Sequence, residues 1–554
     1  MAQVVVIGPP DSLTSLLAER LEPISGAGCR RLLAPASSYA ELLADGTEAI
    51  VYRPPRTGRR DARPDRADAG RFAEACAQAL AGRGGALRVV LLSSAAAHPP
   101  SHHHRGYLRE EEKLPTGHPL ACAWRELERQ VGERLTEAGA EVIVLRPAAV
   151  ALRDGEDHLC RMLRGKVAVL PAGYDPTVQI LHPEDLAAAV RCALEHGSGG
   201  LYHVAPAGAV PVRGALRLAG TRRLPLDAGP VRALTSRLGW TDPAADLGYL
   251  RHACTVSGQK IERELGFVPQ WTSAEAVRDA FGSAEARREP LPELDPFGLD
   301  VSYLDAYGRT LFRVLHDLYW RVEWRGLENV PPQGRAVLTG VHRGFMPWDG
   351  VMALHLLRRE TGRIPRFLIH PCLVKLPFLA NYMTKLGGLI ACQENADWVL
   401  SHDGLLGMFP EGIGGAFTLY RDAYKLGRFG RDEYVKMALR NRAPIVPFVT
   451  LGSAEIYPIL HRVESKLVRR VLEWPYLPIT PTFPLPGLPL PSKWHTRFLA
   501  PIPVHESHGP EAADDPAIVR QISAEVRARM EAAIREMLGR RRSIFFGSVF
   551  SVQV

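Results

Sequence analysis

The sequence predicts an α/β protein with two domains, of which the first is a doubly wound parallel sheet and the second a separate α/β domain. Three observations support this prediction. The chain has 554 residues, more than one hydrophobic core usually holds. Apolar, β-branched runs alternate with helical segments in the first half, and a proline-rich stretch then separates that pattern from a new one. We therefore expect domains at residues 1–285 and 301–554, joined by a linker at 286–300.

The strands and helices expected in the first half follow from hydrophobic periodicity. Four short runs rich in Val, Ile and Leu are typical of strands, and two segments between them have apolar residues at helical spacing. The strands are expected at residues 4–7, 49–52, 87–92 and 142–145, and the helices at 72–80 and 124–135. Continuous apolar strands separated by helices indicate a parallel sheet that is covered on both faces.

A break in this pattern lies at residues 287–300, where the sequence RREPLPELDPFGLD contains three prolines among charged residues. No periodicity survives there, so this stretch is the expected linker. A new helical pattern then begins, with apolar residues at Leu304, Tyr307, Leu311, Leu315 and Leu318. We expect this stripe to pack in the core of the second domain rather than against a membrane.

The last predicted helix begins after Asp515, which is typical of a helix cap, and ends at Gly539. Three arginines at 540–542 then precede the apolar and aromatic segment at 544–546. This combination suits an anionic membrane surface, because the charges attract and the apolar groups insert. Packing of this tail on its own domain is the alternative.

The overall composition is that of a globular protein with an excess of positive charge. The formal net charge is +8 and the isoelectric point is near 9.1, which favours anionic partners such as phospholipid head groups, a phosphorylated cofactor or nucleic acid. The eight cysteines are scattered without a C-x-x-C pair, so neither a zinc site nor a disulfide framework is expected. A reduced, cytoplasmic setting fits this pattern.

The longest apolar stretch, residues 367–392, is interrupted by prolines and charged residues, so it is a poor membrane span. The first residues lead directly into a strand, without the features of a signal peptide. We therefore expect a cytoplasmic protein that is peripheral on the inner face of the membrane. Its expected partner is a lipid, with no nucleic acid and no metal.

Three short blocks in the second half carry the strongest functional signal. They are VHRGFMPWD at 341–349, FPEG at 409–412 and APIVP at 443–447. A histidine and an aspartate beside a strand end, followed by a glutamate in a Pro-Glu-Gly turn, are what acyl transfer to a hydroxyl requires. A hydroxyl attacks a thioester poorly unless a base takes its proton. His342 is the candidate base, and Asp349 the residue that fixes its tautomer and stabilises the imidazolium.

With these blocks, the segment from about residue 300 to the end resembles the glycerolipid O-acyltransferase family, which contains the 1-acylglycerol-3-phosphate acyltransferases. Further matching landmarks are YWRV at 319–322, GLENVP at 326–331 and PIP at 501–503. The resemblance assigns the catalytic roles to His342 and Asp349. It implies transfer of a fatty acyl group from acyl-CoA, or from an acyl carrier protein, to a lipid hydroxyl such as that of a lysophospholipid.

The resemblance also implies a substrate-binding role for residues around the Pro-Glu-Gly turn. Glu411, together with Gly412, is expected to hold the acceptor by accepting hydrogen bonds from its hydroxyls. Arg343, Arg421 and Lys425 are the nearby cations assigned to the substrate.

Two departures from the family pattern change these expectations. Six residues rather than four separate His342 from Asp349, and a continuous helix over that stretch would place them about 10 Å apart. Pro347 suits the first turn of a helix, so we expect residues 342–346 to form a loop and Asp349 to lie just inside the following helix. Two arginines with which the family binds a phosphate are also missing. A neutral lipid alcohol is therefore a second candidate for the acceptor.

Roughly the first 280 residues resemble the extended short-chain dehydrogenase and NAD-dependent epimerase family. The stretches that carry the resemblance are VVVIG at 4–8, LLSS at 91–94, VLRP at 144–147, ILHPEDL at 180–186, LYHV at 201–204 and ELGFVP at 264–269. The resemblance implies a Rossmann-like fold and an NAD(P) site that includes Gly8, Ser93 and Arg146.

The residues that this chemistry requires are altered. The first turn reads GPPD at 8–11, so two amide donors are lost and a negative charge stands near the phosphate position. The Tyr-x-x-x-Lys pair is missing, because Tyr107 is followed by Glu111 and residues 124–130 contain neither tyrosine nor lysine. We expect a non-catalytic first domain. The alternatives are a bifunctional NAD(P)-dependent oxidoreductase or epimerase with an acyltransferase, and a non-enzymatic lipid-sensing scaffold.

Overall fold

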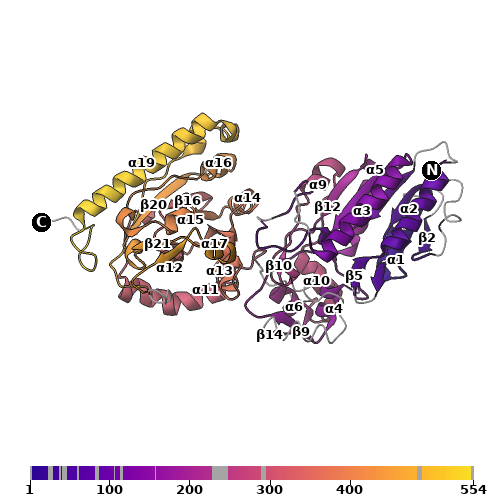
Figure 1. The fold of residues 1–554 in the computed structure, drawn as a ribbon, viewed down its shortest axis with the longest axis horizontal. Coiled ribbons are helices and arrows are strands. Elements are labelled where there is room, and N and C mark those ends of the chain that lie inside the picture. Colours follow the sequence, from indigo (N-terminus) through magenta and orange to yellow (C-terminus); the bar gives the residue numbers. More distant parts are fainter. Residues whose placement is uncertain are drawn as a thin grey trace. The chain divides into compact units, whose positions relative to one another are not determined.

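The computed structural model of the chain divides into two compact units (Figure 1). The first comprises residues 1–298 with 377–381, and the second comprises 299–376 with 382–554. The expected linker includes residues 289–294, which lie outside the described residues. The structure describes residues 3–22, 29–36, 39, 47–58, 61–81, 87–104, 107–112, 117–155, 157–226, 248–288, 295–430, 432–482 and 489–550.

The first unit is built on a six-stranded sheet in which all neighbouring strands are parallel, in the order β2-β1-β3-β6-β7-β12. The chain passes from β1 outward to β2, and then returns past β1 to add the other strands on the opposite side. This is the doubly wound arrangement that the sequence predicts. The strands are β1 (Gln3–Gly8), β2 (Arg30–Leu33), β3 (Thr47–Tyr52), β6 (Arg88–Leu92), β7 (Glu141–Pro147) and β12 (Gly200–Val204).

Different helices cover the two faces of this sheet, because side chains alternate along a strand. Val4 and Val6 of β1 pack in a core with α1, α5 and α9, whereas Val5 and Ile7 pack in a second core with α2 and α3. Both faces are therefore buried, as predicted. The helices are α1 (Ser12–Leu21), α2 (Arg66–Ala81), α3 (Pro119–Glu137), α5 (Pro183–His196) and α9 (Gln259–Leu265).

A smaller lobe of short elements completes the first unit. Its core combines apolar residues of α4, α6 and α10 with those of the short strands around them. The remaining elements of the unit are β4 (Arg56–Gly58), β5 (Asp61–Pro64), η3 (Ala95–Ala97), β8 (Ala149–Val150), α4 (His158–Arg164), β9 (Val167–Pro171), β10 (Thr177–Val178), β11 (Ile180–Leu181), β13 (Val210–Pro211), α6 (Val212–Ala219), β14 (Arg222–Leu226) and α10 (Ser273–Phe281). The four predicted strands are confirmed as β1, β3, β6 and β7, and the two predicted helices as parts of α2 and α3.

The second unit contains a seven-stranded mixed sheet in the order β15-β23-β20-β16-β19-β17-β18. Five neighbouring strands, from β20 to β18, are parallel, and β20 pairs with β23 in the antiparallel sense. The parallel part brings several strand ends to one edge of the sheet. The strands are β15 (Glu323–Arg325), β16 (Ala336–Gly340), β17 (Pro365–Ile369), β18 (Leu389–Ile390), β19 (Leu405–Met408), β20 (Ile445–Leu451) and β23 (His495–Phe498).

Helices and short turns surround this second sheet, and α12 is buried along most of its length. The elements are α11 (Val301–Tyr307), η4 (Gly308–Phe312), η5 (Val314–Tyr319), η6 (Leu327–Asn329), α12 (Trp348–Thr361), η7 (Pro371–Val374), α13 (Leu379–Lys385), α14 (Gln393–Ser401), α15 (Ile413–Ala416), η8 (Tyr420–Asp422), α16 (Glu433–Arg440), η9 (Ser453–Glu455), β21 (His461–Val463), α17 (Lys466–Val471), β22 (Leu477–Ile479), α18 (Val504–Ser507), η10 (Pro510–Asp514) and α19 (Pro516–Arg540).

The helix that opens the second unit corrects one prediction. Leu304 is buried as expected, but Leu311 and Leu318 are 42% and 71% exposed, and Phe312 and Trp320 are buried instead. The reason is that α11 continues into two π-helical stretches, η4 and η5. A π-helical turn closes i→i+5 hydrogen bonds and holds more residues than the 3.6 of an α-helical turn, so the buried face drifts away from the predicted stripe.

The C-terminal helix α19 begins as predicted, with the Asp515 side chain accepting a hydrogen bond from the first turn. The basic segment behind it is not wholly at the surface, because the side chain of Arg541 is only 8% exposed and pairs with Glu455 and Tyr424. Phe546 remains 72% exposed. The tail therefore combines the two alternatives, with one arginine packed inside its own unit and an aromatic ring outside. None of the helices in the described ranges is long and apolar enough to cross a membrane.

Two buried histidines form a hydrogen-bonded pair in the first unit. The Nε2 atoms of His98 and His203 lie 2.8 Å apart, and both side chains are fully buried. One ring must donate and the other accept, so a proton added to the accepting nitrogen breaks the contact. Burial lowers the pKa of both histidines below the ordinary value, so both are neutral at pH 7.

We predict that acid destabilises the first unit through this pair. As the pH falls below about 6.5, both histidines become protonated in the unfolded chain but stay neutral in the folded unit. The full contribution of the pair to the free energy of unfolding is therefore present above that pH. On acidification, the free energy of unfolding falls by up to about 1.4 kcal/mol per histidine per pH unit. Hydrogen exchange in peptides from β6 and β12, corrected for intrinsic rates, measures this slope. A His98→Phe, His203→Leu variant should have a shallower slope, and an unchanged slope would assign the effect to other groups.

Candidate active site

The candidate active site lies at the carboxyl ends of two neighbouring parallel strands of the second unit. His342 follows β16 after one residue, and Glu411 follows β19 after two. Functional residues of open α/β sheets gather at this edge, because the loops that leave the strands meet there. The pairing of β16 with β19 therefore brings the first two sequence blocks together.

His342 and Asp349 are in direct contact. Nδ1 of His342 lies 2.8 Å from Oδ2 of Asp349, despite the six residues between them. Residues 342–346 form a loop and α12 begins at Trp348, so Asp349 lies in the first turn of that helix. The predicted loop and helix start are confirmed, with Pro347 at the helix cap.

Three donors hold the carboxylate of Asp349 in place. Besides the imidazole, it accepts the backbone N–H groups of Arg343, at 2.9 Å, and Gly350, at 2.8 Å. The residue is 1% exposed and stands at the amino end of α12, where the helix dipole favours negative charge. An imidazole that donates from Nδ1 to such a carboxylate keeps a lone pair on Nε2. The geometry thus leaves His342 in the tautomer that a general base requires.

The ring of His342 rests on Phe409, with ring centroids 4.8 Å apart and planes inclined by 27°. Phe409 stacks in turn on Phe367. The His342 side chain is 14% exposed while that of Asp349 has no exposed surface, so the histidine is the member of the pair that a substrate can reach. No pattern in the sequence predicts this contact of Phe409 with His342. The place of Phe409 at the start of the Pro-Glu-Gly block is its only link to the site in the sequence.

Arg343 and Glu411 form a buried bidentate ion pair. The two guanidinium nitrogens lie 2.8 Å and 3.1 Å from the two carboxylate oxygens, and the side chains are 1% and 3% exposed. The carboxylate also accepts the N–H of Gly427 at 2.7 Å, and the guanidinium donates to the carbonyl of Lys425 at 2.9 Å. The pair therefore ties the β16 loop and the β19 turn to the loop around residue 426.

Arg343 and Glu411, which the sequence assigns to the acceptor, contact each other in the structure. Their charged groups are engaged with each other, so an acceptor would have to break a buried ion pair to bind either one. Arg343 also donates to the carbonyl of His342 at 2.6 Å. These contacts connect both side chains to the loop that carries His342. Gly412 forms the next turn with φ +57°, a conformation that favours glycine.

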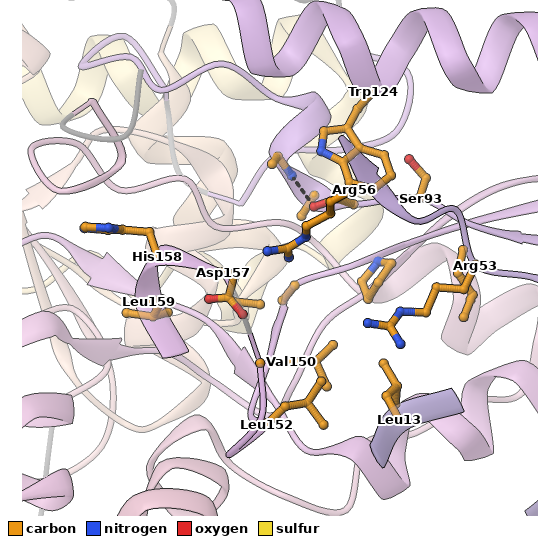
Figure 2. Close-up of a pocket in the computed structure, with 18 of the residues that line it drawn as sticks. Leu13, Arg53, Arg56, Ser93, Trp124, Val150, Leu152, Asp157, His158 and Leu159 are labelled. Carbon is orange, nitrogen blue, oxygen red and sulfur yellow. Dashed lines mark hydrogen bonds between the residues drawn. The ribbon is translucent and has the colours of Figure 1, made fainter. Parts of the chain in front are cut away.

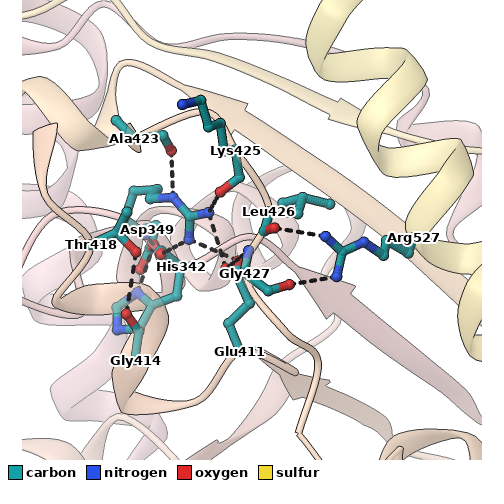
Figure 3. A network of polar contacts seen from close by, with 11 residues as sticks. His342, Asp349, Glu411, Gly414, Thr418, Ala423, Lys425, Leu426, Gly427 and Arg527 are labelled. Carbon is teal, nitrogen blue, oxygen red and sulfur yellow. Dashed lines mark hydrogen bonds and ion pairs between the residues drawn. The ribbon is translucent and has the colours of Figure 1, made fainter. Parts of the chain in front are cut away.

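The other two predicted substrate cations lie at the surface. Arg421 and Lys425 have side chains 80% and 79% exposed, and both pair with Asp422 at 3.4 Å and 2.9 Å. In Figure 3 the ammonium group of Lys425 points away from His342. Lys425 contributes to the site through its backbone carbonyl, which no charge pattern in the sequence could indicate.

The C-terminal helix also reaches this network. Arg527 of α19 donates to the carbonyls of Leu426 and Gly427 at 2.7 Å and 2.6 Å (Figure 3). Gly427 is the residue whose N–H contacts Glu411. A chain of hydrogen bonds therefore runs from α19 through Glu411 and Arg343 to the loop that carries the candidate base.

The predicted cofactor residues of the first unit are largely committed to other partners. Arg146 forms a bidentate pair with Glu128 at 2.8 Å and 2.6 Å, with side chains 6% and 10% exposed, and the Ser93 hydroxyl donates to the same carboxylate. Glu128 follows Trp124 by four residues on α3, so both lie on one face. This is also the spacing of the missing Tyr-x-x-x-Lys pair.

The turn after β1 keeps one feature of a dinucleotide site. A Cβ atom at Gly8 would approach Thr14 Oγ1 to 2.7 Å, so the strand and helix are as close as a glycine allows. The N–H of Thr14, however, is accepted by the carboxylate of Asp11 at 3.0 Å. Burial alone would raise the pKa of Asp11, but the hydrogen bond and charge of Arg53 outweigh it and lower that pKa. A negative charge is therefore fixed at this end of α1.

A second carboxylate occupies the same helix terminus. Asp154 accepts the N–H of Ser12 at 2.8 Å and its hydroxyl at 2.6 Å. A pyrophosphate binds at such a helix end through free N–H groups and the positive end of the dipole. Here carboxylates use those donors, and Pro9 and Pro10 supply none. The residues present do not fit the phosphates of an NAD(P) cofactor.

Comparison with known sequences points to one family for the second unit. Residues 321–451 match the acyltransferase family. Rv0502, an uncharacterized protein of Mycobacterium tuberculosis, is 38% identical over 260 residues, which are 46% of this chain and 72% of that protein. Phytyl ester synthase 1, a chloroplastic protein of Arabidopsis thaliana, is 26% identical over 253 residues, which are 41% of this chain and 35% of that protein.

Among solved structures, a UDP-glucose 4-epimerase from Thermotoga maritima, determined with UDP-glucose, is 15% identical to this chain. The match covers 50% of this chain and 97% of the epimerase, with a TM-score of 0.40. The doubly wound architecture of the first unit follows from its own strand order rather than from this match.

We predict that the Arg343–Glu411 pair stabilises the second unit through its burial. Arg343→Met leaves a buried carboxylate without a counter-ion and should cost about 3–5 kcal/mol, whereas Arg421→Met at the exposed pair should cost less than about 1 kcal/mol. The change in the free energy of unfolding of each variant is measured by denaturant titration, with hydrogen exchange in β16 and β19 as the signal. The double variant Arg343→Met, Glu411→Leu should recover part of the loss. Equal costs for the two single variants would show that the buried pair is not a structural tie.

Proposed function

Because the chain belongs to the acyltransferase family, we propose that its second unit transfers a fatty acyl group from a thioester to the hydroxyl of a lipid. The donor is acyl-CoA or an acyl carrier protein. The observation that carries this proposal is the contact of His342 with Asp349 at the strand ends, where a histidine accessible to solvent is oriented by a buried carboxylate. The first unit takes no part in the chemistry.

The reaction begins with the acceptor hydroxyl near Nε2 of His342. As the hydroxyl oxygen attacks the thioester carbonyl, Nε2 takes its proton, and Asp349 stabilises the imidazolium that results. A carbon–oxygen bond forms and the carbonyl becomes tetrahedral. Collapse of this intermediate breaks the carbon–sulfur bond, and the imidazolium returns its proton to the leaving thiolate. The products are an ester and the free thiol, and His342 is regenerated.

The role of the Arg343–Glu411 pair in this proposal is to hold the loop that carries His342. Arg343 contacts the backbone carbonyl of His342 and offers its own N–H to Asp349, so it fixes both members of the catalytic pair. Small misplacement of a catalytic group costs a large factor in rate. A buried ion pair with defined bidentate geometry is suited to prevent it.

We propose a neutral lipid alcohol, rather than a lysophospholipid, as the preferred acceptor. In the described part of the site, the buried cation Arg343 is compensated by Glu411, and the exposed Arg421 and Lys425 share the single carboxylate of Asp422 at the surface. Among these three cations, a phosphate on the acceptor would find none that is both buried and free of a carboxylate partner. One relative is named a phytyl ester synthase, which agrees with an ester of a long-chain alcohol.

We further propose that the protein meets its lipid substrates as a peripheral protein on the cytoplasmic face of the membrane. Leu318 and Phe546 are 71% and 72% exposed in the second unit. The guanidinium of Arg321 lies 5.7 Å from the centre of the Phe546 ring, so a cation accompanies the exposed apolar group. Apolar groups beside cations favour the surface of an anionic bilayer.

We predict that His342→Ala abolishes acyl transfer, with a loss of roughly 10⁴-fold, and that Asp349→Asn causes a loss of similar order because it disturbs the tautomer. Release of thiol from palmitoyl-CoA in the presence of a long-chain alcohol, with mass spectrometry of the ester, measures the rate. The control is His402→Ala, which removes an exposed histidine of the same unit. Full activity of a folded His342→Ala variant would reject the mechanism.

The acceptor is tested by direct competition. With equal concentrations of phytol and of 1-acylglycerol-3-phosphate in mixed micelles, we expect the phytyl ester to dominate by about tenfold or more, because a phosphate left without a counter-ion costs at least about 1.4 kcal/mol. Quantification of both esters by mass spectrometry gives the ratio. An excess of the phospholipid product would reverse the assignment while leaving the role of His342 intact.

A further inference from the structure

A large cavity lies in the first unit, where the turn after β1 meets the ends of β3, β6 and β7 (Figure 2). Its volume is about 760 Å³, within the range of small-molecule sites. In a doubly wound sheet this is the edge at which ligands bind. The cavity is well formed although the residues around α1 do not fit the phosphates of a dinucleotide.

Most of the residues that line the cavity are apolar. Leu13 at the start of α1, Leu152 beyond β8 and Trp124 of α3 represent three of its walls. Trp124 lies in the segment 124–130, which contains neither tyrosine nor lysine, and its indole lines the cavity. Such walls favour hydrocarbon over the polar rings and sugars of a nucleotide.

The carboxylates of the cavity are already committed. Asp11 bonds to Arg53 and to the N–H of Thr14, and Asp154 bonds to Ser12. Asp157 caps α4 by accepting the N–H of Cys160 at 2.8 Å. In the described part of the chain, none of the three forms an ion pair or hydrogen bond with Arg56.

Arg56 is the cation that remains. It lines the cavity, and in the part of the chain that the structure describes its guanidinium has no hydrogen-bond or ion-pair partner. Figure 2 shows the guanidinium projecting into the space below Trp124. A half-buried arginine without a partner is a ready binding point for a carboxylate, which it can hold through two parallel hydrogen bonds.

We propose that this cavity binds a long-chain fatty carboxylate, with its head on Arg56 and its hydrocarbon chain along the apolar walls. The site is separate from the acyl-transfer chemistry of the second unit and does not rest on it. This proposal explains two features together. The turn after β1 does not fit the phosphates of a dinucleotide, and the cavity beside it has apolar walls and one arginine, Arg56, without a partner among the described residues. The doubly wound domain has exchanged a nucleotide for an anionic amphiphile.

The test uses the full chain with palmitate, hexadecan-1-ol, NAD⁺ and NADPH as ligands. We expect palmitate to bind, and Arg56→Gln to weaken its binding by about ten- to a hundredfold, the loss expected for a hydrogen-bonded charge. For hexadecan-1-ol, which has no carboxylate, the dissociation constant of the Arg56→Gln variant should stay within about twofold of that of the unmodified protein. Arg66→Gln, at an exposed pair with Glu126, is the matched control and should leave both dissociation constants unchanged.

A photoactivatable palmitate with a diazirine near its tail locates the site independently of any variant. Mapping by mass spectrometry should place adducts in residues 9–13, 92–96 and 147–159, and His342→Ala should not change them. Adducts confined to residues 299–554 would overturn the proposal, because palmitate would then occupy the second unit. An unchanged dissociation constant for palmitate in the Arg56→Gln variant would overturn the proposal as well. So would displacement of bound palmitate by NAD⁺ or NADPH at a concentration below that of palmitate.

Discussion

The hydrogen bond between His342 and Asp349 is the contact on which the proposed acyl-transfer chemistry depends. It forms only because α12 starts late enough for Asp349 to sit in its first turn, beneath the loop that leaves β16. A histidine at a strand end is a common residue. A histidine whose Nδ1 is held by a buried carboxylate is a base with a defined tautomer, and the surrounding loops are arranged to keep it so.

Both units show how a buried charge restricts what a site can do. In the second unit, the Arg343–Glu411 pair satisfies two charges and in doing so ties three loops together around His342. In the first unit, pairs between Glu128 and Arg146 satisfy charges at the position where a cofactor would need free groups. Burial demands a partner in each case. The same demand orders the residues around His342 and, in the first unit, gives other partners to groups that a dinucleotide would use.

Much of the architecture could be predicted because strand periodicity is a local property. β1, β3, β6 and β7 lie at the predicted residues, and the loop before α12 follows from Pro347. The stripe of α11 could not be predicted, because π-helical turns change the number of residues per turn and nothing local in the sequence indicated them. The stacking of Phe409 on His342 joins two strands that are far apart along the chain.

The sequence by itself determined the two α/β halves, the order of the strands along the chain and the candidate base with its aspartate. The tertiary structure alone decided which charged side chains are free. Arg343 and Glu411 looked like ligands for a substrate until the pairing of β16 with β19 placed them against each other, and Arg56 drew no notice until the folded unit left it alone in a cavity. The physical reason is that a charge is compensated by neighbours in space, and those neighbours are set by packing between segments that the linear sequence keeps apart.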